Sequence, residues 1–225
     1  MPLCGRFTLL ADELKIKSRF QLEMDIEDYY PSYNIAPGQQ VLAIIYDGEK
    51  RRAGYIKWGL VPFWAKNPKI GNKMINARSE TVHEKPSFKN LLLGKRCLII
   101  ADSFYEWKQT SDGKVPQRIQ MVDRELFAFA GLWDKWQNGN ETLFTCTMLT
   151  KDANSFMKDI HHRMPIILPE DEEKTWLKKS FTNRHEVHTY IQSVSSESMR
   201  AYPVSTYVNF VKNNDETCIK PIPVN

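Results

Sequence analysis

Short apolar runs that end at turn residues recur along this chain and limit the folds open to it. Residues 41–46 form one such run, Asp47-Gly48 follows it, and residues 54–58 return as a second run. Two strand-like runs joined by Asp-Gly predict a β-hairpin, because both residues tolerate the positive φ of a tight hairpin turn. Further strands are predicted at residues 7–10, 97–101, 117–122, 126–133 and 142–150.

Fewer segments have helical spacing. Helices are predicted at residues 11–24, 87–93, 153–160, 170–177 and 184–193. Strands outnumber helices, so we predict an α+β fold with antiparallel sheets. With 225 residues and neither an internal repeat nor an obvious linker, one compact domain is expected over 1–225. Its core is expected at about 4–210, and the polar tail 208–225 is expected to lie irregularly on the surface.

The composition narrows the class of protein. No apolar run is long enough to span a bilayer. The cysteines, at positions 4, 97, 146 and 218, form no Cys-x-x-Cys pair, so we expect no disulfide, metal cluster or cofactor and a reduced, cytoplasmic protein. The formal net charge of +4 permits an anionic partner but does not require one.

The most reactive candidate is Cys4, in the segment Cys4-Gly5-Arg6-Phe7. A cysteine at a chain's N-terminus carries a thiol and an α-amine on one carbon, and an aldehyde can join both into a five-membered thiazolidine ring. An internal cysteine cannot form this ring, because its nitrogen is an amide. As written, Met1-Pro2-Leu3 precede Cys4, so this chemistry requires that they be removed.

Glu106 and His161 are candidates for proton transfer, although each also has a structural interpretation. Glu106 lies between Tyr105 and Trp107. On a strand it could simply face solvent, whereas aromatic neighbours that desolvate it would raise its pKa and suit it to act as a base. His161 precedes His162 and Arg163, and this cluster could cap a helix or contact a phosphate.

Polar and aromatic residues between positions 58 and 80 also allow two interpretations. Asn76 and Arg78 alternate along an extended segment and so point to one side, where they could form a structural network or part of a site. Trp58, Phe63 and Trp64 are core residues by default, yet an aromatic pair beside Pro62 in a loop could stack on nucleobases.

In combination, the motifs are far more specific than any one of them. The chain closely resembles the SOS response-associated peptidase (SRAP) family over about residues 4–210, through these motifs in order: Cys4-Gly5-Arg6-Phe7, Asn34-Ile35-Ala36-Pro37, Trp58-Gly59-Leu60-Val61-Pro62, Asn76-Ala77-Arg78-Ser79-Glu80, Ser103-Phe104-Tyr105-Glu106-Trp107 and His161-His162-Arg163-Met164-Pro165.

The resemblance implies a compact α+β domain of barrel-like sheets with peripheral helices, which binds single-stranded DNA in a positively charged cleft and captures abasic sites covalently. It implies that Cys4 is the nucleophile and that Asn76, Glu106 and His161 are its active-site partners. It further implies DNA contacts, with arginines at phosphates and one of two tryptophans stacking, from these residues: Arg6, Asn34, Pro37, Trp58, Trp64, Arg78 and Arg163.

The chain departs from the family at its start, since members typically begin Met-Cys-Gly-Arg-Phe. Pro2 and Leu3 could be a cloning artefact, an altered start or a leader removed by self-cleavage. If they remain, ring formation should be blocked although DNA could still bind.

Three functions stay open from the sequence. The first is covalent capture of abasic sites in single-stranded DNA by a monomer, with weak lyase activity from the same Schiff base. The second is a cysteine peptidase, acting on peptides in general or only on the residues before Cys4, and the third is a non-covalent reader of modified DNA bases. We expect no membrane contact and, in a bacterium, association with the nucleoid.

Overall fold

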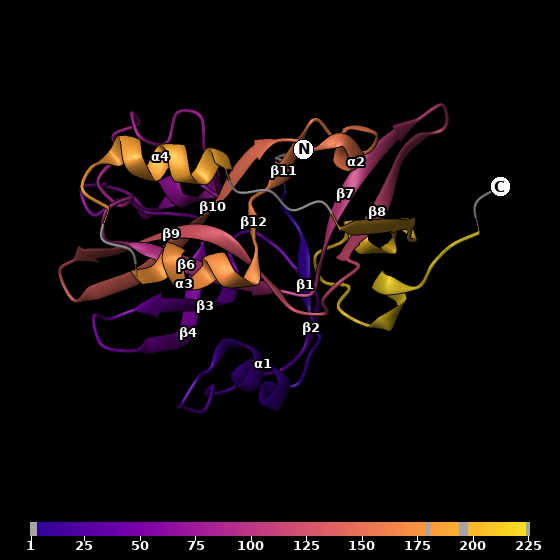
Figure 1. Ribbon diagram of the computed structural model, residues 1–225. Coiled ribbons are helices and arrows are strands. Elements are labelled where there is room, and N and C mark those ends of the chain that lie inside the picture. The colour runs from indigo at the N-terminus through magenta and orange to yellow at the C-terminus, as the bar shows by residue number, and fades with distance from the viewer. Residues whose placement is uncertain (1–3, 179–180, 194–197, 224–225) are drawn as a thin grey trace.

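The computed structural model describes residues 4–178, 181–193 and 198–223 (Figure 1). Two β-sheets form most of it, and the helices lie at their periphery. The smaller sheet has the strand order β13-β8-β7-β1-β2. Its strands are β1 (Phe7–Leu9), β2 (Ser32–Ile35), β7 (Ser103–Thr110), β8 (Gly113–Met121) and β13 (Met199–Pro203).

The larger sheet closes on itself, which confirms the barrel-like α+β prediction. Its order is β11-β10-β4-β3-β6-β9-β12, and β9 also pairs with β10, so five strands form a closed ring. Two pairings are parallel, β4 with β10 and β5 with β10, so the sheet is not antiparallel throughout. The strands are β3 (Gln40–Tyr46), β4 (Arg51–Trp58), β5 (Asn76–Arg78), β6 (Arg96–Ala101), β9 (Phe127–Asn138), β10 (Glu141–Asp152), β11 (Arg163–Pro165) and β12 (Ile167–Leu168).

The helices are short and pack around the barrel. α1 (Glu13–Phe20) begins where the Asp12 side chain accepts a hydrogen bond from the Lys15 amide, and it ends where Gln21 turns left-handed at φ 54°. α3 (Glu170–Lys178) packs against β3, β6 and β9. The remaining helical elements are α2 (Ser155–Lys158), α4 (Arg184–Ser193), η1 (Pro68–Lys73), η2 (Thr206–Asn209) and η3 (Glu216–Ile219).

The structure corrects two local expectations. Pro31 and Pro37 predict an irregular loop over residues 30–38, yet this segment includes strand β2, because the prolines flank Ser32–Ile35 and remove no donor from the ladder with β1. Residues 87–93 form successive turns in place of a helix, with bonds from Phe88 and Lys89 to the same Lys85 carbonyl.

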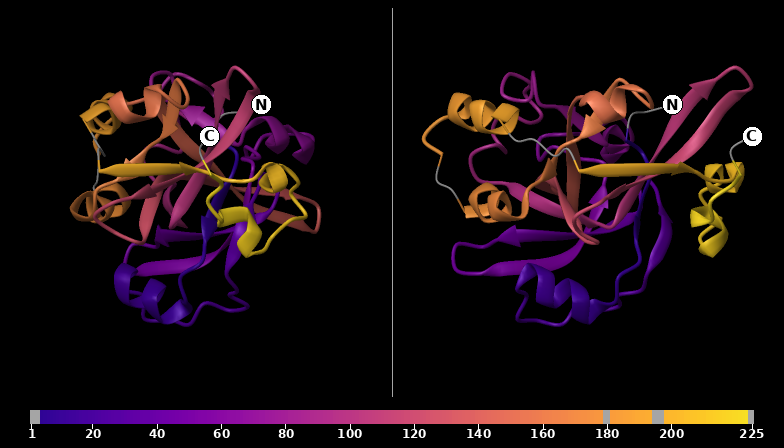
Figure 2. Two further views of the ribbon diagram at one scale, coloured as in Figure 1. Left: turned by 90° about the vertical axis from the view of Figure 1, so that its right-hand side faces the viewer. Right: turned by 45° about the vertical axis from the view of Figure 1, so that its right-hand side comes forward.

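The C-terminal tail is more ordered than its composition predicts. The β7–β8 hairpin projects from the barrel, and the segment after β13 packs beside it (Figure 2). There Val208 and Cys218 are fully buried in a small apolar cluster with Tyr105 and Trp107. Among the described residues, no helix is both long and apolar enough to cross a membrane.

Candidate active site around Cys4

Cys4 lies just before β1, and its backbone nitrogen faces a carboxylate. The side chain is buried, with 3% exposed, and its backbone adopts a left-handed φ of 41°. The Cys4 N–H donates to Glu106 Oε1 at 2.8 Å. This nitrogen is the atom that would become the α-amine of a chain beginning at Cys4.

Strand register explains why Glu106 meets Cys4. β1 and β7 run antiparallel with Phe7 opposite Phe104, so residues after Phe104 lie beside those that precede Phe7. Because side chains alternate along a strand, Tyr105 and Trp107 enter the cluster under the C-terminal segment, while Glu106 turns toward Cys4. Glu106 is 3% exposed, so the desolvated interpretation of this residue fits the structure and the solvent-facing one does not.

Burial controls the protonation of the Cys4 thiol and of the Glu106 carboxyl. It raises the pKa of the Cys4 thiol well above its usual value, and the negative charge of Glu106 raises it further. Burial also raises the pKa of the Glu106 carboxyl, against the opposing effects of its hydrogen bonds from Cys4 and the charge of His161. The thiol is therefore neutral near pH 7, and Glu106 is a stronger base than an exposed glutamate.

His161 lies between α2 and β11 and is partly buried. His161 Nδ1 lies 3.2 Å from both the N–H and the carbonyl oxygen of Arg163, so it accepts from the first in one tautomer and donates to the second in the other. His161 is close enough to Glu106 to influence its pKa. The structure thus brings together three of the predicted catalytic residues, Cys4, Glu106 and His161.

Asn76 and Arg78 occupy β5, which pairs with β10 at Met148 and Thr150. β11 pairs with the same end of β10, at Thr150 and Asp152, so β10 holds the segments that carry Asn76 and His161 next to each other. Asn76 is partly buried, whereas Arg78 is exposed.

Arg163 does not present a free charge as the resemblance implied. Its guanidinium is buried and donates to both oxygens of Glu80, at 2.6 and 2.9 Å, and to Asp152 at 2.5 Å. It also donates to the Thr150 carbonyl at 3.0 Å. Sequence reasoning missed this ion-pair cluster, which links the ends of β5, β10 and β11, although Glu80 stands in a motif beside Asn76 and Arg78.

Arg6 and Asn34 hold the C-terminal segment. Arg6 donates to the Asn34 side chain and to the Val208 carbonyl, at 2.7 and 2.6 Å. Asn34, which is 1% exposed, donates to the Val208, Phe210 and Asn213 carbonyls. These contacts satisfy Asn34 within the fold, while Pro37 is partly exposed at the end of β2.

Of the two predicted stacking residues, the structure leaves only Trp64 accessible. Trp58 is 1% exposed, packs 5.3 Å from Phe7 between ring centroids, and donates from Nε1 to the Ile75 carbonyl, so the prediction that it stacks on DNA is corrected. Trp64 is 50% exposed. Its neighbour Phe63 is 61% exposed, so these two rings are both accessible beside Pro62.

Hydrogen bonds hold the loop that carries Phe63 and Trp64 at three points. The Val61 N–H donates to Thr145, the Phe63 N–H donates to Asp134, and Trp136 Nε1 donates to the Ala65 carbonyl. The two exposed rings are therefore presented by a rigid backbone. Within the described part of the chain, no group of three or more His, Cys, Asp or Glu side chains could hold a metal ion.

Comparisons with known proteins identify a family that this chain matches. The sequence model of one family, described as SOS response associated peptidase (SRAP), matches residues 3–211. The chain is 48% identical over 223 residues to the abasic site processing protein YoqW of Bacillus subtilis, covering 97% of this chain and 99% of that protein. It is 36% identical to the abasic site processing protein HMCES of Gallus gallus, covering 86% of this chain and 67% of that protein.

A solved structure shares the fold. The crystal structure of a protein from Bacteroides thetaiotaomicron superimposes with a TM-score of 0.84 at 26% identity, covering 98% of this chain and all of the other. Because the family model matches most of this chain, the chain belongs to the SOS response-associated peptidase (SRAP) family.

Proposed function

We propose that this protein recognises abasic sites in single-stranded DNA and captures them covalently through Cys4. The names of its relatives, abasic site processing proteins, support this substrate. The observation that carries the proposal is the 2.8 Å contact between the Cys4 nitrogen and Glu106 Oε1, in a buried position next to the thiol. A base at that nitrogen suits amine chemistry on an aldehyde.

The α-amine must first be released from the peptide bond between Leu3 and Cys4. The Cys4 thiol would attack the Leu3 carbonyl carbon, its proton would pass through Glu106 to the Cys4 nitrogen, and the carbon–nitrogen bond would break to leave a thioester and the free amine. Water would then hydrolyse the thioester and regenerate the thiol. The left-handed φ of Cys4, which costs an L-residue about 1–2 kcal/mol, favours a step that frees this backbone.

Capture would then proceed in two bond-forming steps. The neutral amine attacks the aldehyde carbon of the open abasic sugar, and Glu106 accepts the amine proton. Loss of water gives an imine. The Cys4 sulfur then bonds to the imine carbon and its proton passes to the nitrogen, which closes the thiazolidine. Placing thiol, amine and base in one buried site gives ring closure the advantage of proximity.

His161 would assist by proton transfer at the sugar. An abasic deoxyribose exists mostly as a closed hemiacetal, and opening it to the aldehyde moves a proton between oxygens. An imidazole can donate a ring proton there and recover it later. The same Schiff base can lose the phosphate at its β-carbon, so weak lyase activity is expected beside capture.

A single experiment tests the proposed function. Protein shown by its intact mass to begin at Cys4 is incubated with a single-stranded oligonucleotide that contains one abasic site, and the mixture is separated on a denaturing gel. We expect a crosslink that survives denaturation, with a mass equal to protein plus oligonucleotide minus one water. Reversible binding without any crosslink, or cleavage of unrelated peptides, would contradict the proposal.

We expect Arg78→Ala and Arg163→Ala to have different effects. Arg78 is exposed, so its loss should weaken single-strand binding and reduce the log–log salt slope by about 0.7, the value for one phosphate contact. Arg163 already pairs with Glu80 and Asp152, so its loss should leave this slope unchanged and destabilise the fold by about 1–3 kcal/mol. Salt titrations of DNA binding measure the slope for each variant, and thermal unfolding measures its stability. An unchanged slope for Arg78→Ala would show that it does not contact phosphate.

Trp64→Ala should weaken DNA binding without altering the fold. Stacking of a base on an aromatic side chain contributes about 1–3 kcal/mol, so the dissociation constant should rise by about 5- to 150-fold. Trp64 is half exposed, so its removal opens no cavity. Phe144→Ala, at a ring of similar exposure (47%), is the matched control and should bind normally. Equal effects of the two variants would contradict a stacking role for Trp64.

A further inference from the structure

A second cavity lies away from the site around Cys4. It has a volume of about 620 Å³, within the range of about 300–1,000 Å³ that is typical of small-molecule sites. Its wall includes Leu9 at the end of β1 away from Cys4, together with parts of β2, β3 and β4. In Figure 1, β2 and α1 lie at the opposite end of the molecule from β11 and α2, which flank His161. The proposed capture of abasic sites uses none of these walls.

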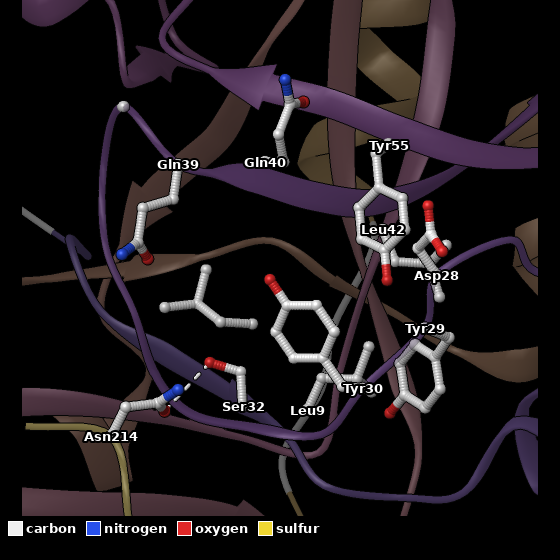
Figure 3. A pocket seen from close by; sticks show the side chains of 12 residues that line it. Leu9, Asp28, Tyr29, Tyr30, Ser32, Gln39, Gln40, Leu42, Tyr55 and Asn214 are labelled. Carbon is white, nitrogen blue, oxygen red and sulfur yellow. Dashed lines mark hydrogen bonds between the residues drawn. The ribbon is translucent and has the colours of Figure 1, made fainter.

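Tyrosines and side-chain amides dominate the lining (Figure 3). Tyr30 is 71% exposed and Tyr55 is 37% exposed, so both offer ring surface to a ligand. Among the described lining residues, Asp28 alone is charged, and neither lysine nor arginine contributes. A site of this composition repels phosphate and favours a flat, uncharged molecule with a polar edge.

The two ends of the cavity differ in hydrogen-bonding character. Gln39 and Asn214 lie on one side of Tyr30, and Asp28 and Tyr55 lie on the other (Figure 3). The Gln39 side-chain oxygen accepts from the Ala36 N–H at 2.8 Å. The Asn214 oxygen accepts from Ser32 Oγ and from the Tyr33 N–H. With both amide oxygens engaged, the NH₂ groups of Gln39 and Asn214 remain as donors on this side of the cavity, while the Asp28 carboxylate is an acceptor on the other side.

A planar ring that fits must therefore carry acceptors at one end and a donor at the other. Adenine has this arrangement, because its ring nitrogens accept and its exocyclic amino group donates. Amide side chains and carboxylates are the groups that proteins use for such base edges, and aromatic rings stack on base faces. We propose that this cavity binds an adenine-type base that carries an exocyclic amino group, either as a free nucleoside or within a DNA strand.

Adenosine and inosine test the proposal as a matched pair, since inosine carries a carbonyl oxygen in place of the amino group and a proton on the adjacent N1. Titration calorimetry or saturation-transfer NMR with the full protein should show adenosine binding at least about tenfold more tightly than inosine. Asp28→Asn should remove this preference, because an amide can also donate to the inosine oxygen. Equal binding of the two nucleosides to the unaltered protein, or no binding of adenosine at millimolar concentration, would overturn the proposal.

Tyr30→Ala should weaken adenosine binding by about 5- to 150-fold through lost stacking. Phe210→Ala is the matched control, because Phe210 is equally exposed at 71% and lies outside the cavity. Adenosine affinity that is the same for Tyr30→Ala and Phe210→Ala would also count against this site. Both variants should still crosslink abasic DNA, so failure of this site is distinguishable from failure of the proposed function.

The source of the base is decided with oligonucleotides. Abasic strands flanked by adenine or by hypoxanthine are compared on the unaltered protein and on Asp28→Asn. If the strand supplies the base, adenine flanks should bind more tightly, and only to the unaltered protein. If a free nucleoside is the ligand, the two strands should bind alike while adenosine retains its advantage over inosine.

Discussion

Protein that begins at Cys4 should crosslink to abasic single-stranded DNA, and Cys4→Ala should abolish the stable product. The ring requires a free amine and a thiol on one residue, and the alanine variant retains only the amine. That variant should still form a transient imine, which borohydride reduces to a trapped adduct. The assay is a denaturing gel with and without borohydride.

Protein that retains Pro2 and Leu3 is the decisive comparison. Its Cys4 nitrogen is an amide, so it should bind the strand but form no thiazolidine. After loss of Met1, the secondary amine of Pro2 could give at most an iminium. Intact mass establishes which form is present in each lane. If the longer form crosslinks as fast as the form that begins at Cys4, the thiazolidine mechanism is wrong and Cys4 acts as an ordinary thiol.

Glu106→Gln should slow crosslinking by about 10²–10⁴-fold, the usual contribution of a general base. The glutamine keeps the shape and can still accept the hydrogen bond from the Cys4 nitrogen, but it cannot take up a proton. Single-turnover crosslinking rates measure the effect. Binding to undamaged strands should barely change, and Gln109→Ala on the exposed part of β7 is a control that should crosslink normally.

The direction of the Glu106 pKa shift adds two expectations. Crosslinking needs the carboxylate, so its rate should fall as the pH drops through a pKa that lies above the usual value for glutamate. The raised pKa also means that ionised Glu106 is unfavourable in the folded state above the unfolded pKa. Glu106→Gln should therefore unfold at an equal or higher temperature near pH 7. A variant that loses crosslinking, DNA binding and thermal stability together would indicate a folding role.

Local signals in the sequence predicted much of the secondary structure. The hairpin of β3 and β4 follows from two apolar runs and Asp47-Gly48, since both the runs and the turn are encoded within a few residues. The motif order likewise predicted a site at Cys4, Glu106 and His161, and the structure brings all three together. Their catalytic roles stay a prediction, which rests on their residue types and on the motifs.

Tertiary structure decided what each remaining side chain is free to do. Trp58 and Trp64 stand in one aromatic segment, yet one fills the barrel core and the other faces solvent. Arg78 and Arg163 carry the same charge, yet only Arg163 is neutralised, by Glu80, which lies far away in the sequence. Burial and pairing depend on partners that strand register brings together across the fold. The sequence therefore predicts which groups are reactive, and only the folded structure determines which of them are accessible to a DNA strand.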